Sequence, residues 1–198
     1  CNLLTMIKFL LVFVICLPSF LHAKQSNKVM KKEVSGQKLK YLLSVPEGKP
    51  DKNGWPLLLF LHGAGERGSD LEKVKVHGPP KLINKFPQLK NAIVISPQCP
   101  SSSWWIPSTL MALVKEVVKS HDNKIDKNRI YITGLSMGGY GTWNLISKNP
   151  NYFAAAAPIC GGGSVRSLRN VLSINDSETF KLEDLKRAKE LPIWVFHG

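Results

Sequence analysis

A serine flanked by glycines follows a short apolar run, and its type and spacing suit nucleophilic chemistry. Residues 134–138 read Gly-Leu-Ser-Met-Gly, after the strand-like run Ile130–Ile132 and before a helix-like segment over 139–147. A sharp turn from strand to helix would hold Ser136 on a strained backbone with its hydroxyl exposed. The first N–H groups of the helix would face the place where negative charge develops during attack. The pattern therefore predicts a nucleophilic serine.

The two glycines of this motif have a steric role. Side chains at Gly134 and Gly138 would collide with the neighbouring strand and helix, so the tight turn needs glycine at both positions. The bare pattern arises by chance in about one chain in ten of this length, and a glycine-rich turn with an incidental serine is the alternative. The strand before and the helix after favour the nucleophile elbow.

A second glycine-rich loop follows the buried strand expected at 57–61. It reads His-Gly-Ala-Gly-Glu-Arg-Gly over His62–Gly68, and Gly63 and Gly65 would let its backbone N–H groups approach a ligand. A phosphate-binding loop is the competing interpretation, but the Gly-Lys-Ser/Thr ending is missing. We interpret His62 as a buried histidine at a strand end, rather than a catalytic base.

The elements that must position these loops alternate along the chain. Apolar runs predict buried strands, and the spacing of Leu110, Leu113, Val114, Val117 and Val118 predicts an amphipathic helix with Ser108 as its N-cap. The expected strands are 39–45, 57–61, 92–96, 130–132, 154–159 and 193–196; the helices are 69–76, 110–118, 139–147 and 182–190; turns are expected at 77–80 and 122–128. This order predicts an α/β fold with a doubly wound, mostly parallel sheet. In such sheets functional groups gather beyond the carboxyl ends of the strands.

Composition fits one globular domain. The chain has 198 residues, of which 43% are hydrophobic and 21% charged, and this balance argues against disorder. The formal net charge of +13 would favour binding to nucleic acid or to another anionic surface. The lysines are scattered and no nucleic-acid motif is present, so we expect a lysine-rich solvated surface and no nucleic-acid partner. We expect no cofactor and no metal, and the oligomeric state is left open.

The N-terminal region has the features of an export signal. Met6 is the expected initiator, followed by a positive Lys8, an apolar stretch over 9–17 and a small residue, Ala23. The stretch is too short to span a bilayer, so a signal peptide over residues 1–23 is favoured over a stable membrane anchor. A lipoprotein signal at Cys16 fits less well. We expect a secreted or periplasmic domain over residues 24–198.

Two cysteines, Cys99 and Cys160, follow the export signal. An oxidising compartment permits a disulfide between them. Both follow predicted strands that the expected strand order separates, so two unpaired, half-buried thiols are the favoured alternative.

Several motifs in order carry a resemblance to a known family. His-Gly-Ala-Gly-Glu-Arg-Gly, Ser-Pro-Gln-Cys-Pro (96–100), Arg-Ile-Tyr-Ile-Thr-Gly-Leu-Ser-Met-Gly-Gly-Tyr-Gly-Thr-Trp (129–143) and Ala-Pro-Ile-Cys-Gly-Gly (157–162) resemble secreted bacterial α/β-hydrolases. These are the predicted peptidases and phospholipase/carboxylesterase-like esterases, akin to dienelactone hydrolase and to feruloyl or polyhydroxybutyrate-depolymerase esterases. The likeness covers about residues 38–198.

The resemblance implies a role for each matching residue. It makes Ser136 the nucleophile and assigns the oxyanion hole to the backbone N–H groups of Met137 and Ala64, with Trp105 and Tyr140 lining the substrate cleft. The implied substrate is a small-molecule or polysaccharide-linked ester.

The resemblance also implies where the remaining catalytic groups lie. In this fold the order along the chain is serine, acid, histidine, and His197 is the only histidine after Ser136. Because His197 ends a strand, we expect the acid and the base, with the last strand and helix of the fold, beyond Gly198. The 198-residue chain alone is then expected to be nearly inactive.

The sequence therefore favours an exported serine hydrolase that cleaves carboxylic esters. A serine peptidase of the prolyl-oligopeptidase type is the nearest rival. A non-catalytic module that binds polysaccharide through a basic, tryptophan-bearing face is the alternative from another class.

Overall fold

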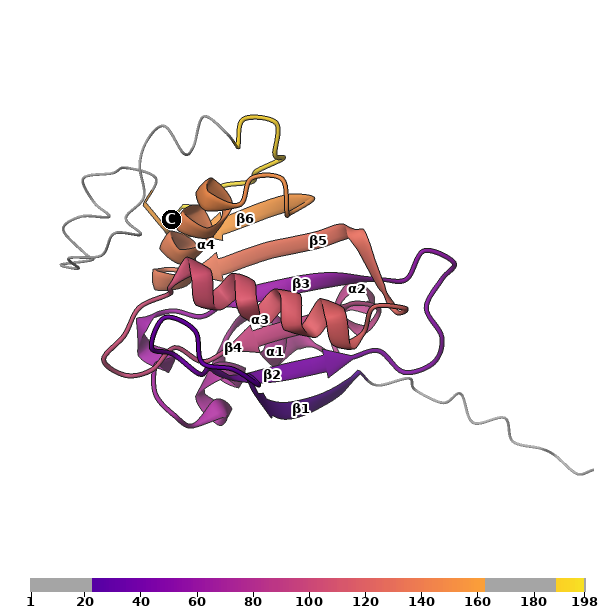
Figure 1. The fold of residues 1–198 in the computed structure, drawn as a ribbon, viewed down its shortest axis with the longest axis horizontal. Helices are drawn as coiled ribbons and strands as arrows, with labels where there is room; N and C mark the ends of the chain where they lie inside the picture. Colours follow the sequence, from indigo (N-terminus) through magenta and orange to yellow (C-terminus); the bar gives the residue numbers. More distant parts are fainter. Residues whose placement is uncertain (1–22, 163–187, 198) are drawn as a thin grey trace, which may run out of the picture.

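The computed structural model describes residues 23–162 and 188–197. Its centre is a six-stranded sheet in the order β1-β2-β4-β3-β5-β6 (Figure 1). The strands are β1 Lys24–Val29, β2 Lys40–Val45, β3 Trp55–Leu61, β4 Ile93–Pro97, β5 Ile125–Leu135 and β6 Ala155–Ile159. β4, β3, β5 and β6 are parallel, whereas β2 pairs antiparallel with both β1 and β4. The mostly parallel sheet expected from the sequence is confirmed.

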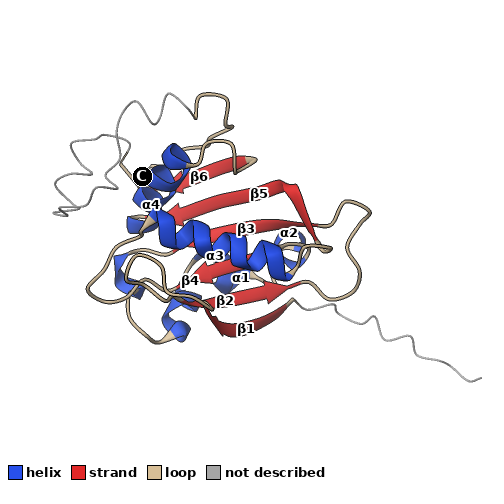
Figure 2. Cartoon of the chain, in the orientation of Figure 1, coloured by secondary structure: helices blue, strands red, loops and turns tan. Residues whose placement is uncertain are grey.

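Helices cover both faces of the sheet, as a doubly wound fold requires. The α-helices are α1 Gly78–Leu82, α2 Pro87–Lys90, α3 Pro107–Ser120 and α4 Met137–Lys148, with 3₁₀-helices η3 Ala64–Glu66 and η4 Leu71–Val76. α3 and α4 lie on one face of the sheet, and α1 and α2 lie on the other (Figures 1 and 2).

The core forms where β3 and β4 meet α3. Leu57 and Leu59 on β3 and Leu113 and Val114 on α3 are fully buried. Each such side chain contributes about 1.5–3 kcal/mol through burial. The apolar stripe predicted for α3 is thus confirmed, but the predicted cap is wrong. The helix begins at Pro107 after Ile106, which places Ser108 inside its first turn.

Three local expectations differ from the structure. The polar segment β1 had no strand signal, yet it forms an edge strand on β2, where lysines are tolerated because one side faces solvent. β5 begins at Ile125, inside the predicted 122–128 turn. The predicted turn at 77–80 contains the start of α1, because prolines fit the first helical turn, where N–H groups need no helical partner.

The segment 193–196 was predicted to be a buried strand, and this is wrong. It lies parallel to β6 through isolated bridges from Ile193 to Ala156 and from Phe196 to Ile159. Trp194 is 78% exposed, because the segment lies outside the edge strand rather than between two strands.

The two cysteines are free thiols. Cys99 follows β4 and is buried, whereas Cys160 follows β6 and is exposed, so the prediction that both thiols are half-buried is wrong. β3 and β5 lie between β4 and β6, which confirms the predicted separation.

The predicted export signal and most of the predicted 182–190 helix lie outside the described residues. Among the helices that are described, none is long and apolar enough to cross a bilayer.

Candidate active site

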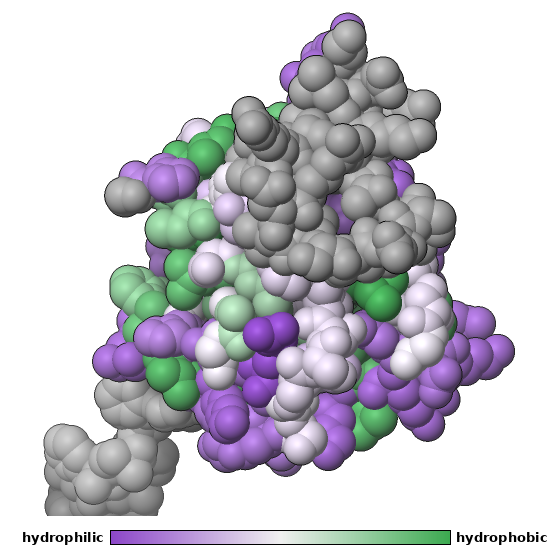
Figure 3. All heavy atoms as spheres, turned by 90° about the vertical axis from the view of Figure 1, so that its left-hand side faces the viewer, coloured by the Kyte–Doolittle hydropathy of each residue, from purple (hydrophilic) through white to green (hydrophobic). Residues whose placement is uncertain are grey.

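The loops singled out in the sequence meet at the carboxyl edge of the parallel strands. Loop 62–70 follows β3, loop 98–106 follows β4, and Ser136 follows β5. Figure 3 views the molecule from this side and shows hydrophilic and hydrophobic residues next to one another on it. Neighbouring parallel strands bring these three segments together, as expected for this class of sheet.

Ser136 has the geometry that the elbow pattern predicts. It lies between β5 and α4 with φ of 53° and ψ of −113°, a conformation that a residue other than glycine rarely adopts. Its N–H donates to the carbonyl oxygen of Ile159 at 2.8 Å, which ties the turn to the end of β6. The residue is exposed, so its hydroxyl lies where a substrate can reach it.

The glycines of the elbow are required by close backbone packing. A Cβ at Gly138 would lie 1.9 Å from the Leu61 carbonyl oxygen, and one at Gly134 would lie 2.2 Å from the Gly138 oxygen. Both distances are far below contact, so α4 crosses β3 at a spacing that only glycine permits. The steric reason inferred from the sequence is confirmed at both positions.

Met137 and Gly63 are the backbone neighbours of this serine. Met137 is the first residue of α4, so its N–H has no acceptor within the helix. Gly63 lies next to Ser136, because a Cβ on Gly63 would be 3.7 Å from the Ser136 Cβ. Ala64 follows Gly63 and is exposed at the start of η3. The structure thus brings together the three residues that sequence analysis assigned to one site.

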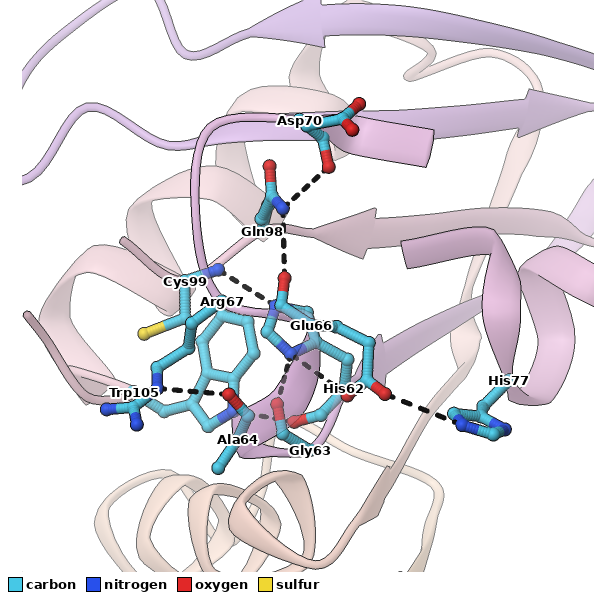
Figure 4. A network of polar contacts seen from close by, with 10 residues as sticks. All are labelled: His62, Gly63, Ala64, Glu66, Arg67, Asp70, His77, Gln98, Cys99 and Trp105. Atoms are coloured by element: carbon cyan, nitrogen blue, oxygen red, sulfur yellow. Dashed lines mark hydrogen bonds and ion pairs between the residues drawn. The ribbon is translucent and has the colours of Figure 1, made fainter. Parts of the chain in front are cut away.

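His62 holds the loop that carries Ala64 (Figure 4). The imidazole is 1% exposed; its Nε2 accepts a hydrogen bond from the Cys99 N–H at 3.0 Å, and its Nδ1 lies 2.6 Å from the Gly63 carbonyl oxygen. A backbone N–H can only donate, so Nε2 carries no proton and Nδ1–H donates to Gly63. The prediction that His62 is a buried strand-end histidine is confirmed.

The hydrogen bond to Gly63 also orients its neighbour. The Gly63 carbonyl and the Ala64 N–H belong to one planar trans peptide, so they point in opposite directions. The carbonyl faces the buried His62 ring, and the Ala64 N–H therefore points away from it. Burial lowers the pKa of His62 below its usual value, which favours the neutral tautomer that this arrangement needs.

Replacing His62 with glutamine is expected to lower the free energy of unfolding by about 1–3 kcal/mol at pH 7, because a buried backbone partner loses its hydrogen bond. In the unmodified protein, as pH falls below about 6.5, His62 is protonated in the unfolded state before it is protonated in the folded state, because its pKa in the folded state is lowered. The free energy of unfolding therefore decreases as pH falls from about 6.5 to the lowered pKa of the folded state. Urea unfolding at pH 7 and pH 5 should show this decrease, and a smaller one in the variant. Equal decreases would assign the pH dependence to another group.

Further contacts fasten loop 62–70 to the loop after β4. Gln98 Nε2 donates to the carbonyl oxygens of Glu66 at 2.9 Å and Asp70 at 2.7 Å (Figure 4). The Gly68 N–H donates to the Cys99 oxygen at 2.9 Å. No local sequence pattern marks Gln98, because only the fold places its amide beneath the loop.

The phosphate-loop alternative depends on the element that follows the first glycine. Residues 63–68 do have the spacing Gly-x-Gly-x-x-Gly, but η3, a three-residue 3₁₀-helix, follows the first glycine in place of a long α-helix. A dinucleotide-binding loop relies on the N-terminus of such a helix for the pyrophosphate. The structure therefore does not support that interpretation.

The two aromatic residues assigned to the cleft differ in position. Trp105 is 1% exposed; its ring packs against His62 with centroids 4.8 Å apart, and its Nε1–H donates to the His62 oxygen at 3.2 Å. Because both its ring and its polar atom are used inside the protein, Trp105 is a core residue and not the cleft-lining residue that was predicted. Tyr140 is half-buried, and the half-buried Trp104 lies beside it, with ring centroids 6.5 Å apart.

Two hollows lie away from Ser136. One of about 520 Å³ lies between residues 30–34 and α3, and another of about 500 Å³ lies against β5 and β6 beside Trp194. Within residues 23–162 and 188–197, no group of three or more His, Cys, Asp or Glu side chains is placed to hold a metal ion.

The chain is similar to several known proteins. The model of the Prolyl oligopeptidase family matches residues 108–180, which include the elbow. Poly(3-hydroxyalkanoate) depolymerase C of Paucimonas lemoignei is 31% identical over 129 residues, 60% of this chain and 30% of that protein. The crystal structure of a thermostable esterase has a TM-score of 0.63 and 32% identity over 88% of this chain. The chain therefore has the α/β-hydrolase fold.

More distant structures show the same fold. S-formylglutathione hydrolase of Staphylococcus aureus has a TM-score of 0.65 at 18% identity, covering 89% of this chain and 80% of that one. The acylaminoacyl peptidase of Pyrococcus horikoshii has a TM-score of 0.63, also at 18% identity, covering 89% of this chain and 32% of that one. This α/β-hydrolase spans 55% of the length of the thermostable esterase and 30% of that of the depolymerase.

Proposed function

We propose that this α/β-hydrolase is an exported serine hydrolase that cleaves carboxylic esters through an acyl-enzyme on Ser136. The observation that carries the proposal is the placement of Ser136, which is exposed at positive φ at the start of α4, beside Gly63. An exposed hydroxyl next to two backbone donors is the arrangement that acyl transfer needs.

The proposed reaction has two steps. The Ser136 oxygen attacks the ester carbonyl carbon as a general base takes its proton, and the carbonyl electrons move to oxygen. The N–H groups of Met137 and Ala64 bind that oxyanion; loss of one such donor typically lowers turnover about 10²- to 10³-fold. The intermediate collapses to the acyl-enzyme as its C–O bond breaks, and the leaving alkoxide takes the proton from the base to become the alcohol. Water then hydrolyses the acyl-enzyme to the acid and free Ser136.

The proposed reaction also needs a general base and an acid that orients it, and the family resemblance gives a histidine and an aspartate or glutamate that follow the serine along the chain. His62 does not fit the role, because both of its ring nitrogens are used by backbone groups. Within the described part of the chain, the Ser136 hydroxyl has no hydrogen-bonding side chain beside it.

A serine peptidase is the second candidate, favoured by the match of residues 108–180 to the Prolyl oligopeptidase family. Both candidates use the same nucleophile and oxyanion donors, but an amide has a poorer leaving group than an ester. The choice therefore rests on substrate preference.

The complete gene product should hydrolyse a 4-nitrophenyl ester of a short acid faster than the 4-nitroanilide of the same acid. The acyl groups of the two substrates are identical, so the ratio of kcat/KM reports the bond that is preferred. An anilide cleaved as fast as the ester would favour the peptidase. Hydrolysis of neither, with polysaccharide bound, would favour the non-catalytic module.

A further inference from the structure

Arg67 is a cation beside the proposed oxyanion hole. In the described part of the chain, no acidic side chain pairs with its charge. It lies on the Gly-Ala-Gly-Glu-Arg-Gly loop, three residues after Ala64, and is half-buried. Of the carboxylates within residues 23–162 and 188–197, none lies within ion-pair distance of its guanidinium. Its neighbour Glu66 lies 3.8 Å from His62 Nδ1 and 3.6 Å from His77 Nε2 instead.

Arg129 shows how a structural arginine is satisfied in this protein. Its Nε donates to Asp126 at 2.8 Å, and its Nη2 donates to Asp51 at 3.1 Å and to the Gly54 oxygen at 2.6 Å. Two carboxylates thus neutralise Arg129 at the other end of the sheet. Arg67 has no equivalent pair, although it is always charged.

Backbone carbonyls hold the Arg67 guanidinium in place. Its Nε donates to the Ala64 oxygen at 3.2 Å, and its Nη1 donates to the Ser103 oxygen at 3.3 Å. In Figure 4 the side chain extends along Ala64 and away from the Glu66–His77 pair. The guanidinium therefore bridges the loops after β3 and β4, at the residue that carries the proposed oxyanion donor.

This anchoring leaves donors available. A guanidinium has five N–H groups, and the two carbonyls leave both N–H groups of Nη2 without an acceptor in the described residues. An oriented cation with spare donors fits a carboxylate, which accepts two parallel hydrogen bonds. The half-buried Trp104 directly follows Ser103, the residue whose carbonyl holds Arg67, and its ring lies beside that of Tyr140.

We propose that Arg67 is a specificity-determining residue that binds a carboxylate on the substrate, so that the enzyme prefers esters carrying a negative charge near the scissile bond. This inference rests on the proposed function, because it places the substrate at Ser136 and Ala64. The carboxylate belongs either to the acid or to the alcohol of the ester.

Two pairs of substrates separate these sources. 4-Nitrophenyl hemisuccinate and 4-nitrophenyl butanoate differ by a carboxylate in the acid, and 4-carboxyphenyl acetate and phenyl acetate differ by one in the alcohol. In the complete gene product, Arg67→Met should lower kcat/KM for the anionic member of at least one pair by roughly 10- to 100-fold, as expected for loss of a hydrogen-bonded charge. The neutral members should change by less than about threefold.

Two further variants control for structure and charge. Arg67→Lys keeps the positive charge but lacks the planar guanidinium that can donate two parallel hydrogen bonds. It should recover only part of the preference for the anionic ester that Arg67→Met loses. Lys28→Met removes one positive charge from the exposed edge strand β1 and should leave both ratios unchanged. Equal losses on anionic and neutral esters would show that Arg67 only clamps the two loops, and would overturn the proposal, as would unchanged ratios in both pairs.

A binding measurement separates this inference from the proposed reaction. Monomethyl succinate and 4-carboxyphenyl acetate, which carry the carboxylate in the acid and in the alcohol, are each titrated by calorimetry into the Ser136→Ala protein, with and without Arg67→Met, so no turnover is needed. Weaker binding of either ester in the double variant supports the carboxylate site even if ester hydrolysis fails. Equal binding of both esters overturns the site and leaves the role of Ser136 intact.

Discussion

Ser136→Ala is expected to lower the rate of ester hydrolysis by the complete gene product by at least about 10⁴-fold. Loss of the nucleophile in one well-studied serine protease costs about 10⁶-fold, because the remaining triad members act only through it. The exposed hydroxyl at φ of 53° is the group that the proposed reaction depends on. The measurement is kcat/KM for a short 4-nitrophenyl ester.

A matched variant controls for non-specific effects. Ser102→Ala removes another exposed hydroxyl, from the loop after β4, and should retain activity within about twofold of the unmodified protein. Circular dichroism should show that both variants are folded. An active Ser136→Ala protein would remove the basis of the proposed mechanism.

Gly138→Ala should lower the free energy of unfolding by about 3 kcal/mol or more, or prevent folding. The added Cβ would lie 1.9 Å from the Leu61 oxygen and 2.5 Å from the Leu61 carbonyl carbon, both of which are backbone atoms. No rotamer change relieves a backbone clash, so α4 and β3 would have to move apart, and overpacking of this kind is among the larger mutational effects. Urea unfolding of the purified variant measures the loss.

Gly65→Ala is the control for this prediction. Gly65 lies on the neighbouring loop and has an ordinary φ, and a Cβ added there would meet no atom within 4 Å. Alanine at this position should therefore change stability by less than about 1 kcal/mol. If the two alanine variants were equally stable, the close approach of α4 to β3 would be wrong.

The parts of the site that sequence analysis predicted are those set by local sterics. Ser136 and its flanking glycines form a turn whose requirements lie within five residues, and Gly63 and Ala64 directly follow a buried strand. The continuous apolar runs of β3 and β4 likewise identify strands buried on both faces.

Other features depend on contacts between distant segments. Trp105 is buried because His62 and Gly141 leave room for its ring, since a Cβ on Gly141 would lie 2.8 Å from that ring. β1 is a strand because β2 offers it a partner, and no apolar alternation in Lys24–Val29 reveals this. The contacts of Gln98 and Arg67 cross from one loop to another. Patterns along one segment carry no information about such pairs.

The proposed reaction depends on Ser136 as its nucleophile. The most direct measurement is labelling of the complete gene product with a fluorophosphonate, followed by peptide mapping by mass spectrometry. The phosphonyl group should be found on Ser136 alone, since only an activated serine next to an oxyanion hole reacts readily. A label on Ser101, Ser102 or Ser103 in its place would contradict the account.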